Sequence, residues 1–206
     1  YVGIPFCPSI CLYCSFGSHV LSRWAHMVEP YLEALFRELR FISQQMKDYT
    51  LDTVYIGGGT PTTLTPDQMR RLLTVLAEEF PLEQVQEFTV EAGRPDTITR
   101  EILEVLREFP VGRISINPQT MNQETLDLIG RRHTVEETIE VFHMAREMGF
   151  DNINMDLIVG LPGEDAAKVA PTLEEIEKLA PDSLTVHSRA LKRATRLNLM
   201  KDQYTE

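Results

Sequence analysis

Residues 54–76, VYIGGGTPTTLTPDQMRRLLTVL, contain one complete strand-to-helix unit. An apolar run leads into three glycines and a proline, a pattern typical of a buried parallel strand that ends in a tight turn. Thr65, Pro66 and Gln68 then match a capping box, with the threonine as N-cap and the proline at the first helical position. The segment therefore predicts a strand, a glycine-rich turn and an amphipathic helix, in that order.

Comparable units recur along the 206 residues. Strands are expected at 1–5, 53–57, 87–91, 112–117, 152–159 and 183–186. One helix is indicated by an apolar stripe at three- and four-residue spacing, formed by Val28, Leu32, Leu35, Phe36, Leu39 and Ile42. Another helix is expected to begin at a second capping box, Thr134 with Glu137, and to end at Gly149.

The spacing of these units indicates the architecture. Each is near the roughly 30 residues that one strand-helix-strand crossover needs. A closed TIM barrel has eight units and about 250 residues, whereas this chain supplies six. We therefore expect an α/β fold with a parallel sheet, a partial (three-quarter) TIM barrel of the (β/α)6 type whose open side can admit a large substrate.

Composition narrows the class of protein. The chain is 43% hydrophobic, which suits one folded core, and its net charge of -11 lacks the basic footprint of a nucleic-acid binder. No apolar run approaches the roughly 20 residues that span a bilayer, and no signal segment opens the chain. We expect a cytoplasmic protein with no membrane span and no nucleic-acid partner.

The only cysteines are Cys7, Cys11 and Cys14, spaced CxxxCxxC. An odd number within one loop does not suit a disulfide scaffold. Three thiolates can hold three irons of a [4Fe-4S] cubane and leave the fourth iron open. With His19 the same cysteines could instead form a Cys3His zinc site. The spacing by itself leaves both metal sites open.

The notable motifs follow the expected strands, at 7–14, 57–61, 91–95, 117–120 and 160–164. In parallel α/β folds the ligands lie at the carboxyl ends of the strands, so these segments should meet in one site. A zinc knuckle explains none of this placement, which favours the cluster. The GGGTP run at 57–61 lacks the Lys-Ser/Thr of a phosphate loop, but its glycines allow a ligand to approach the backbone closely.

The motifs resemble those of the radical S-adenosylmethionine (SAM) superfamily, in particular the oxygen-independent coproporphyrinogen III oxidases and their relatives. The resemblance extends over nearly the whole chain and includes YxxxPFCxxxCxYC, VYIGGGTPTTL, RISINPQT, GRRH at 130–133 and NMDLIVGLPGE. The segments VEAGRPDTIT and INPQTMNQETLDLIGRRHT are most similar to the sequences of the anaerobic coproporphyrinogen dehydrogenase branch of Bacillus and clostridial type. We expect residues 1–206 to be a radical SAM core domain taken from a longer protein.

The resemblance implies a [4Fe-4S] cluster held by Cys7, Cys11 and Cys14, and two SAM molecules. It implies that the SAM on the open iron contacts Tyr1, Gly58 and Glu91, and that the second contacts Tyr13, Gly59, Thr60, Gln119, Arg131 and Asp156. Burial agrees with a ligand role for Asp156, because an acid in a strand of apolar residues is costly without a partner. No side chain is assigned a catalytic role, since the cluster and SAM carry the chemistry.

The resemblance also implies a reaction of heme biosynthesis. A deoxyadenosyl radical takes a hydrogen atom from the β-carbon of a coproporphyrinogen III propionate, and loss of CO2 and one electron leaves a vinyl group. The partners are then the porphyrinogen, an electron donor for the cluster and an electron acceptor. Candidate propionate contacts are Arg94, Arg113, Arg131, Arg132, Arg189 and Arg193, of which Arg94 and Arg113 are expected nearest the strand tips.

Two histidines and Phe16 also bear on the function. His133 and His187 are expected to be hydrogen-bonded structural residues and not acid-base catalysts. Phe16 stands where the established oxidases have a further cysteine, two positions beyond the third cluster ligand, and the heme-trafficking relatives share this substitution. The alternative function is therefore a heme chaperone that keeps the cluster and binds heme.

Overall fold

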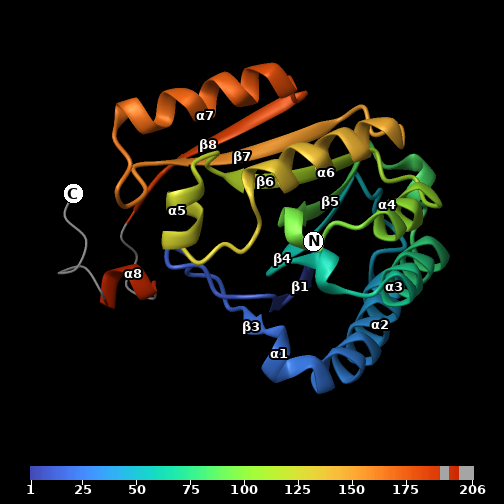
Figure 1. Cartoon of the computed structure of the whole chain (residues 1–206). Helices are drawn as coiled ribbons and strands as arrows, with labels where there is room; N and C mark the ends of the chain where they lie inside the picture. The colour runs from blue at the N-terminus through green and yellow to red at the C-terminus, as the bar shows by residue number, and fades with distance from the viewer. Residues whose placement is uncertain (191–194, 200–206) are drawn as a thin grey trace.

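The computed structural model of the protein describes residues 1–190 and 195–199 (Figure 1). Its centre is a six-stranded sheet in which every neighbouring pair is parallel. The strands follow chain order: β1 (Val2–Ile4), β4 (Thr53–Gly58), β5 (Glu87–Gly93), β6 (Arg113–Gln119), β7 (Ile153–Val159) and β8 (Ser183–Ser188). The sheet is curved (Figure 1). Within the described residues β1 and β8 each have only one neighbouring strand, so the sheet does not close into a barrel. The predicted parallel α/β sheet is confirmed.

The longer helices surround the outside of the curved sheet (Figure 1). They are α2 (Val28–Gln45), α3 (Pro66–Glu79), α4 (Arg100–Arg107), α6 (Val135–Glu147) and α7 (Ala166–Leu179). Short α-helices are α1 (Leu21–Trp24), α5 (Gln123–Leu128) and α8 (Arg196–Leu199). Short 3-10 helices are η1 (Ala25–Met27), η2 (Pro61–Thr63), η3 (Leu82–Gln84) and η4 (Pro95–Thr97). No helix of the described part is long and apolar enough to cross a membrane.

The helix ends follow the sequence signals. At α3 and at α6 the threonine N-cap accepts a hydrogen bond from the third helical N–H, and the glutamine or glutamate there accepts one from the cap, so both capping boxes form. Gly149 has φ +86°, which a residue without a β-carbon adopts readily. The stripe on α2 is buried up to Leu39, whereas Ile42 is 38% exposed. Ile42, the last residue of the stripe, therefore lies beyond the buried part of the helix, which ends one turn earlier.

Alternate residues of the strands divide the sheet into two faces. The outer set packs under the helices and includes Ile56, Val90, Ile114, Ile116 and Met155, all 0% exposed. The residues between them, such as Glu91, Asn117 and Asp156, face the inside of the curve. The hydrophobic core therefore lies between sheet and helices, and the concave face is left for polar groups.

Two strands run further than the sequence predicts, and both contain an irregularity. β5 continues to Gly93 with a register shift against β6 between Glu91 and Gly93, and β6 continues to Gln119 with a second shift. Gln119 has φ +72°, a conformation that is uncommon for a residue with a side chain. Such irregularities re-aim side chains at the ends of strands, here at the edge where the predicted ligands lie.

The cysteine loop is closed by a small sheet that the sequence did not reveal. β2 (Phe6–Cys7) pairs in parallel with β3 (His19–Val20), and the His19 N–H donates to the Pro5 carbonyl over 2.7 Å. This pairing brings the two ends of the loop together just beyond β1. The loop thus has a defined position over the carboxyl edge of the large sheet.

Candidate functional site

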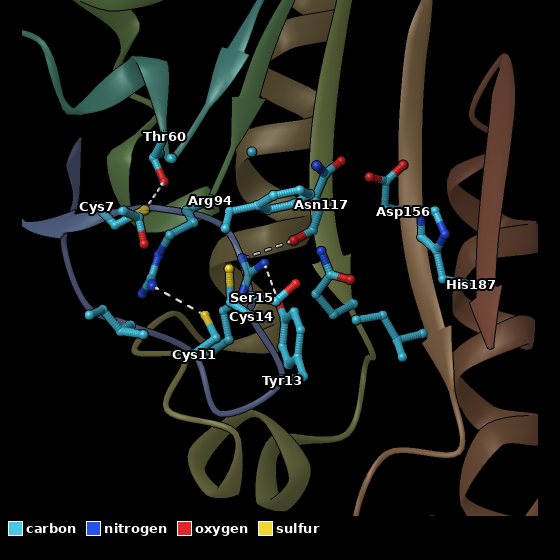
Figure 2. Close-up of a pocket in the computed structure, with 18 of the residues that line it drawn as sticks. Cys7, Cys11, Tyr13, Cys14, Ser15, Thr60, Arg94, Asn117, Asp156 and His187 are labelled. Atoms are coloured by element: carbon cyan, nitrogen blue, oxygen red, sulfur yellow. Dashed lines mark hydrogen bonds between the residues drawn. The ribbon is translucent and has the colours of Figure 1, made fainter. Parts of the chain in front are cut away.

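A cavity of about 290 Å³ lies where the cysteine loop, the glycine turn and the ends of β5 to β8 meet (Figure 2). Figure 2 shows the cysteines on one side of it, with Asp156 and His187 on the other. All the predicted cofactor residues line it except Tyr1: Cys7, Cys11, Tyr13, Cys14, Gly58, Gly59, Thr60, Glu91, Gln119, Arg131 and Asp156. Segments far apart in the sequence therefore form one site, as strand order predicts.

Tyr1 occupies a different place. It precedes β1, is 81% exposed, and its ring stacks on that of Tyr55 with the centroids 5.9 Å apart. Tyr55 in turn lies beside Glu91, whose oxygen is among the atoms nearest a β-carbon built on Gly57. Tyr1 is thus on the concave side of the sheet near Glu91, but it does not line the cavity.

The glycine turn needs glycine at consecutive positions for steric reasons. Gly58 has φ +112°, and a β-carbon there would lie 2.9 Å from the Ile4 nitrogen. A β-carbon on Gly59 would lie 2.7 Å from the Phe6 carbonyl oxygen and 3.0 Å from the Cys7 sulfur. The Gly59 N–H also donates to the Ile4 carbonyl over 2.7 Å. The turn is therefore packed directly against the start of the cysteine loop.

The three thiols are free of disulfides and line the same cavity. The Cys7 sulfur is 3.4 Å from the Thr60 hydroxyl, and the Cys11 sulfur is 3.7 Å from a guanidinium nitrogen of Arg94. Burial raises the pKa of Cys7 and the pKa of Cys14 above the ordinary value of a thiol. These two groups are protonated in the metal-free protein at neutral pH, so metal binding must release their protons.

The placement of the thiols distinguishes the two metal sites that the sequence left open. Within the described residues no three His, Cys, Asp or Glu side chains are arranged to hold one metal ion. His19 does not line the cavity, and its ring packs 4.9 Å from that of Trp24. Among the described residues, His19 is therefore not placed to complete a Cys3His set with the three thiols. A cubane places its thiolates on three different irons, so the cysteines can surround it without converging on one point.

Two acids lie on the inner face of the sheet. Burial raises the pKa of Glu91 to about 7, and the negative charge of Asp156 contributes to the shift. The Asn117 amide is 3.5 Å from a Glu91 oxygen, and the Asn154 amide donates to Asp156 over 2.7 Å. Near neutral pH Glu91 therefore exchanges its proton readily, and it can become charged when a cationic or hydrogen-bonding ligand arrives.

Arg131 is held rigidly behind the cysteine loop. It is 7% exposed, donates to the Asn117 carbonyl over 3.1 Å and to the Tyr13 hydroxyl over 2.9 Å. Burial raises the pKa of Tyr13, which keeps its hydroxyl neutral. The Arg131 Nε is buried and has no hydrogen-bond partner among the described residues. Arg131 is therefore part of the site and not a solvated helix end.

The candidate propionate contacts separate into different environments. Arg94 is 3% exposed and grips Asp96 through two hydrogen bonds of 3.0 and 3.1 Å, so it is not available to a carboxylate ligand. Arg113 was wrongly expected near a strand tip. It begins β6 at the end of the sheet opposite the cavity, where it bonds Glu87 and Ser183.

The remaining arginines also differ. Arg132 is exposed and lies outside the cavity, and Arg193 lies outside the described residues. Arg189 lines the cavity, and of the arginines in the described lining it is the one whose guanidinium has no hydrogen-bond or ion-pair partner. It is therefore the cationic side chain in this cavity that is ready to meet an anionic ligand.

The two histidines lie in different environments. His187 is exposed and lines the cavity. His133 is 0% exposed, and although neither ring nitrogen makes a hydrogen bond of regular geometry in the described structure, the Pro118 backbone interacts with the ring as a weaker hydrogen-bond partner. Burial, together with the positive charge of Arg131, lowers the pKa of His133 to about 4. The ring is thus kept neutral and packs as a core residue.

Sequence reasoning missed the inner-face amides that hold the predicted ligands. Asn117 contacts both Glu91 and Arg131, and Asn154 contacts Asp156. The signal was present, because Ser115, Asn117 and Gln119 recur at every second position of RISINPQ. Polar residues at that period in a buried strand indicate a second, polar face.

Comparison with known proteins agrees with this geometry. The profile of the Radical SAM superfamily matches residues 1–176. The oxygen-independent coproporphyrinogen-III oxidase-like protein HemZ of Bacillus subtilis is 48% identical over 99% of this chain and 41% of its own length. The heme chaperone HemW of Lactococcus lactis is 38% identical over 93% of this chain and 48% of its own length.

Solved structures confirm the partial-barrel fold. The structure of coproporphyrinogen III oxidase (HemN) from Escherichia coli superimposes with a TM-score of 0.84 and 30% identity, over 98% of this chain and 50% of that one. The radical SAM methyltransferase TsrM from Kitasatospora setae shares the fold at a TM-score of 0.69 and 15% identity, over 98% of this chain and 37% of that one. This chain spans about half the length of its curated relatives, or less.

The three-thiol loop, the glycine turn and the strand-end cavity thus agree with the matched profile, relatives and fold. A [4Fe-4S] cluster and SAM are the cofactors of this group, and the donor set of the cavity fits them. The chain belongs to the radical SAM superfamily, in the group formed by the oxygen-independent coproporphyrinogen III oxidases and their close relatives.

Proposed function

We propose that this chain forms the radical SAM core of an anaerobic coproporphyrinogen III dehydrogenase, which converts two propionates of its substrate into vinyl groups. One observation carries the proposal: a single cavity joins the three cysteine thiols to a strand-end acid and to Arg189, an arginine whose guanidinium is unpaired within the described residues. Such a cavity can hold a redox centre and a carboxylate-bearing substrate at the same edge of the sheet.

Cys7, Cys11 and Cys14 are the residues that would hold the cluster, one thiolate to each of three irons. When bound, the cluster and SAM supply a carbon-centred radical that removes a hydrogen atom from the propionate β-carbon. An electron donor for the cluster and an acceptor for the substrate electron are required as partners. The chain's own contribution is to position these groups and to keep water from them.

The SAM on the open iron of the cluster would contact Gly58 and Glu91. Gly58 lines the cavity without a side chain, and Glu91, with a pKa of about 7, can accept a hydrogen bond from an ammonium or a ribose hydroxyl. A carboxylate that loses its proton on meeting a cation gains a charge-assisted hydrogen bond. Tyr1 stays a prediction for the same ligand, although its position outside the cavity gives it no support.

A second SAM would contact Tyr13, Gly59, Thr60, Gln119, Arg131 and Asp156. The buried Arg131 Nε supports this assignment, because a buried donor without a protein partner is costly unless a ligand accepts from it. Gln119 supports it too, since its φ of +72° is the kind of strained backbone that persists at binding sites.

Arg189 would contact a substrate propionate. Its guanidinium is unpaired within the described residues, and a planar guanidinium can hold a carboxylate through two parallel hydrogen bonds. Arg94 and Arg113 are excluded from this role by their existing partners. The proposal therefore assigns propionate recognition to the end of β8.

Product analysis tests the function. The full-length protein, reconstituted anaerobically with iron and sulfide, should convert coproporphyrinogen III to its divinyl product in the presence of SAM and a reductant. Arg189→Met should raise the KM for the porphyrinogen about tenfold or more and leave SAM affinity unaffected, because one charge-assisted contact is lost. Cleavage of SAM with no decarboxylation in the wild-type protein would contradict the proposal.

A heme chaperone is the second candidate, and Phe16 favours it. Phe16 lines the cavity and is 73% exposed. An exposed aromatic side chain at this place is available to pack against a flat apolar ligand. Heme titration should then show stoichiometric binding with both propionates retained, weakened by Phe16→Ala. Phe41→Ala is the matched control, because Phe41 is 61% exposed on α2, away from the cavity. Absence of stable heme binding would remove this candidate.

A further inference from the structure

Arg94 is a buried cation that the proposed reaction does not use. It follows Gly93, where β5 ends with φ +69°, and only 3% of its surface is exposed. A buried charge must be paired and hydrogen-bonded, or burial is costly. Asp96 provides the pairing, since its two oxygens accept from the Nε and one terminal nitrogen of Arg94 over 3.0 and 3.1 Å. The second terminal nitrogen of Arg94 remains.

That second nitrogen is directed at the cysteine loop. It donates to the Ser9 hydroxyl over 2.8 Å, lies 3.5 Å from the Ser9 carbonyl and is 3.7 Å from the Cys11 sulfur. The Ser9 hydroxyl in turn donates to the Gly130 carbonyl over 3.0 Å. Figure 2 shows Arg94 reaching across to Cys11 from the strand side of the cavity. One side chain thus connects the end of β5 to the middle of the loop.

The contact is specific to one of the three thiols. Cys7 meets a neutral partner, the Thr60 hydroxyl, at 3.4 Å. Within the described structure no arginine or lysine N–H bonds the sulfur of Cys7 or Cys14. Cys11 is therefore distinguished by a donor that belongs to a charged group, which makes the stronger kind of hydrogen bond.

We propose that Arg94 is a positioning residue for the cysteine loop, and that its N–H···S hydrogen bond to Cys11 raises the reduction potential of the bound cluster. Reduction adds one electron and so one negative charge to the cluster, and part of that charge lies on the thiolate sulfurs. A donor aimed at one sulfur stabilises the reduced form more than the oxidised form. The inference depends on the cluster and not on the identity of the substrate.

Because Arg94 is paired with Asp96, the N–H···S hydrogen bond, and not the net charge of the site, is the main cause of the higher reduction potential. Arg94 and Asp96 together are formally neutral, so their long-range field at the cluster is small. Replacing both by neutral residues in Arg94→Met/Asp96→Asn leaves the net charge of the site unchanged and removes the N–H donor. A shift of potential in this variant therefore reports the hydrogen bond.

The experiment is a redox titration of the anaerobically reconstituted full-length protein with dithionite, followed by the electron paramagnetic resonance signal of the reduced cluster, with no porphyrinogen present. We expect the double variant to lower the equilibrium constant for one-electron reduction about tenfold, equivalent to about 59 mV. Arg189→Met, which removes a cation from the same cavity but no bond to a cysteine, should shift the potential less.

The outcomes are separable. An unchanged potential in a double variant with full iron content overturns the inference, and so does an equal shift in Arg189→Met. If the double variant loses iron, Arg94→Lys carries the test. Lysine keeps the charge but lacks the planar fork that can hold Asp96 and reach Cys11 together, so a smaller shift in the same direction is expected. No shift in Arg94→Lys overturns the inference, and none of these readings depends on turnover.

Discussion

The two faces of the sheet use the same strands for opposite purposes. On the outer face of β5, Phe88 and Val90 are at most 2% exposed and pack under the helices. On the inner face, Thr89 and Glu91 alternate with them, and Glu91 lines the cavity. The difference teaches that one strand can stabilise the fold through every second residue and hold a site through the others.

Burying the polar groups of the inner face costs free energy, whereas burying the apolar outer face stabilises the fold. Asn154 donates to Asp156 and Ser115, and it accepts from Ser183 and Thr185, so a chain of hydrogen bonds crosses three strands. Even so, Glu91 is buried deeply enough that its pKa rises to about 7. An interior of this kind gives up burial of apolar surface that would stabilise the fold.

The largest expected effect comes from the loop above the inner face. Replacing Cys7, Cys11 or Cys14 by alanine should abolish stable cluster binding, since each thiolate holds a separate iron. The sheet and helices should stay folded, because the loop lies outside the core between them. Iron and sulfide per chain and far-UV circular dichroism measure the two effects. Ser15→Ala, in the same loop and lining the same cavity, is the control that should keep full iron.

The outer face is tested by Ile116→Ala. Ile116 is 0% exposed, and its truncation should lower the free energy of unfolding by about 2–5 kcal/mol through lost burial and a cavity. Ser115→Ala, one residue away on the inner face, should cost about 1 kcal/mol, the value of a typical hydrogen bond. Urea unfolding compares them. Equal losses would show that the two faces contribute alike to stability.

Asp156→Asn tests ligand binding on the inner face. It removes the charge but not the shape, so SAM affinity should fall roughly 10- to 100-fold, as expected for one charge-assisted hydrogen bond. Iron content should be unchanged, because Asp156 lies across the cavity from the cysteines (Figure 2). Equilibrium binding of SAM to the cluster-loaded protein measures this. Asp151→Asn, on the exposed entry to β7, is the control, and a loss of iron in Asp156→Asn would contradict the assignment.

The smallest effect concerns the cost of the inner face. The pKa of Glu91 is about 7 in the folded protein, above its ordinary value of 4.5, so the folded state binds more protons between these values. Ligand-free stability therefore falls as pH rises from 4.5 to 7. Glu91→Gln should remove this loss and raise the free energy of unfolding by on the order of 2 kcal/mol at about pH 8, with a smaller gain at about pH 5. Urea unfolding at both pH values measures the gain. If the gain were independent of pH, titration of Glu91 would not be its cause.

Local patterns predicted much of this molecule. The parallel strands in chain order, both capping boxes and the meeting of motifs at one edge follow from residues close in sequence. The errors have local causes as well. Arg113 was expected at a strand tip, yet it opens β6, and two irregularities carry β5 and β6 past their expected ends. Strand ends are set by pairing with neighbours, which a single segment does not contain.

By itself the sequence determined the fold class and the three-thiol site, because periodicity, caps and cysteine spacing are properties of short segments. Only the tertiary structure decided which charged side chains remain free. The sequence does not distinguish Arg94, Arg131 and Arg189, since all three are arginines. In the structure, Arg94 bonds Asp96 and Ser9, and Arg131 bonds Tyr13 and Asn117. Arg189 is unpaired within the described residues. Pairing depends on groups brought together from distant strands, and that proximity exists only once the sheet has formed.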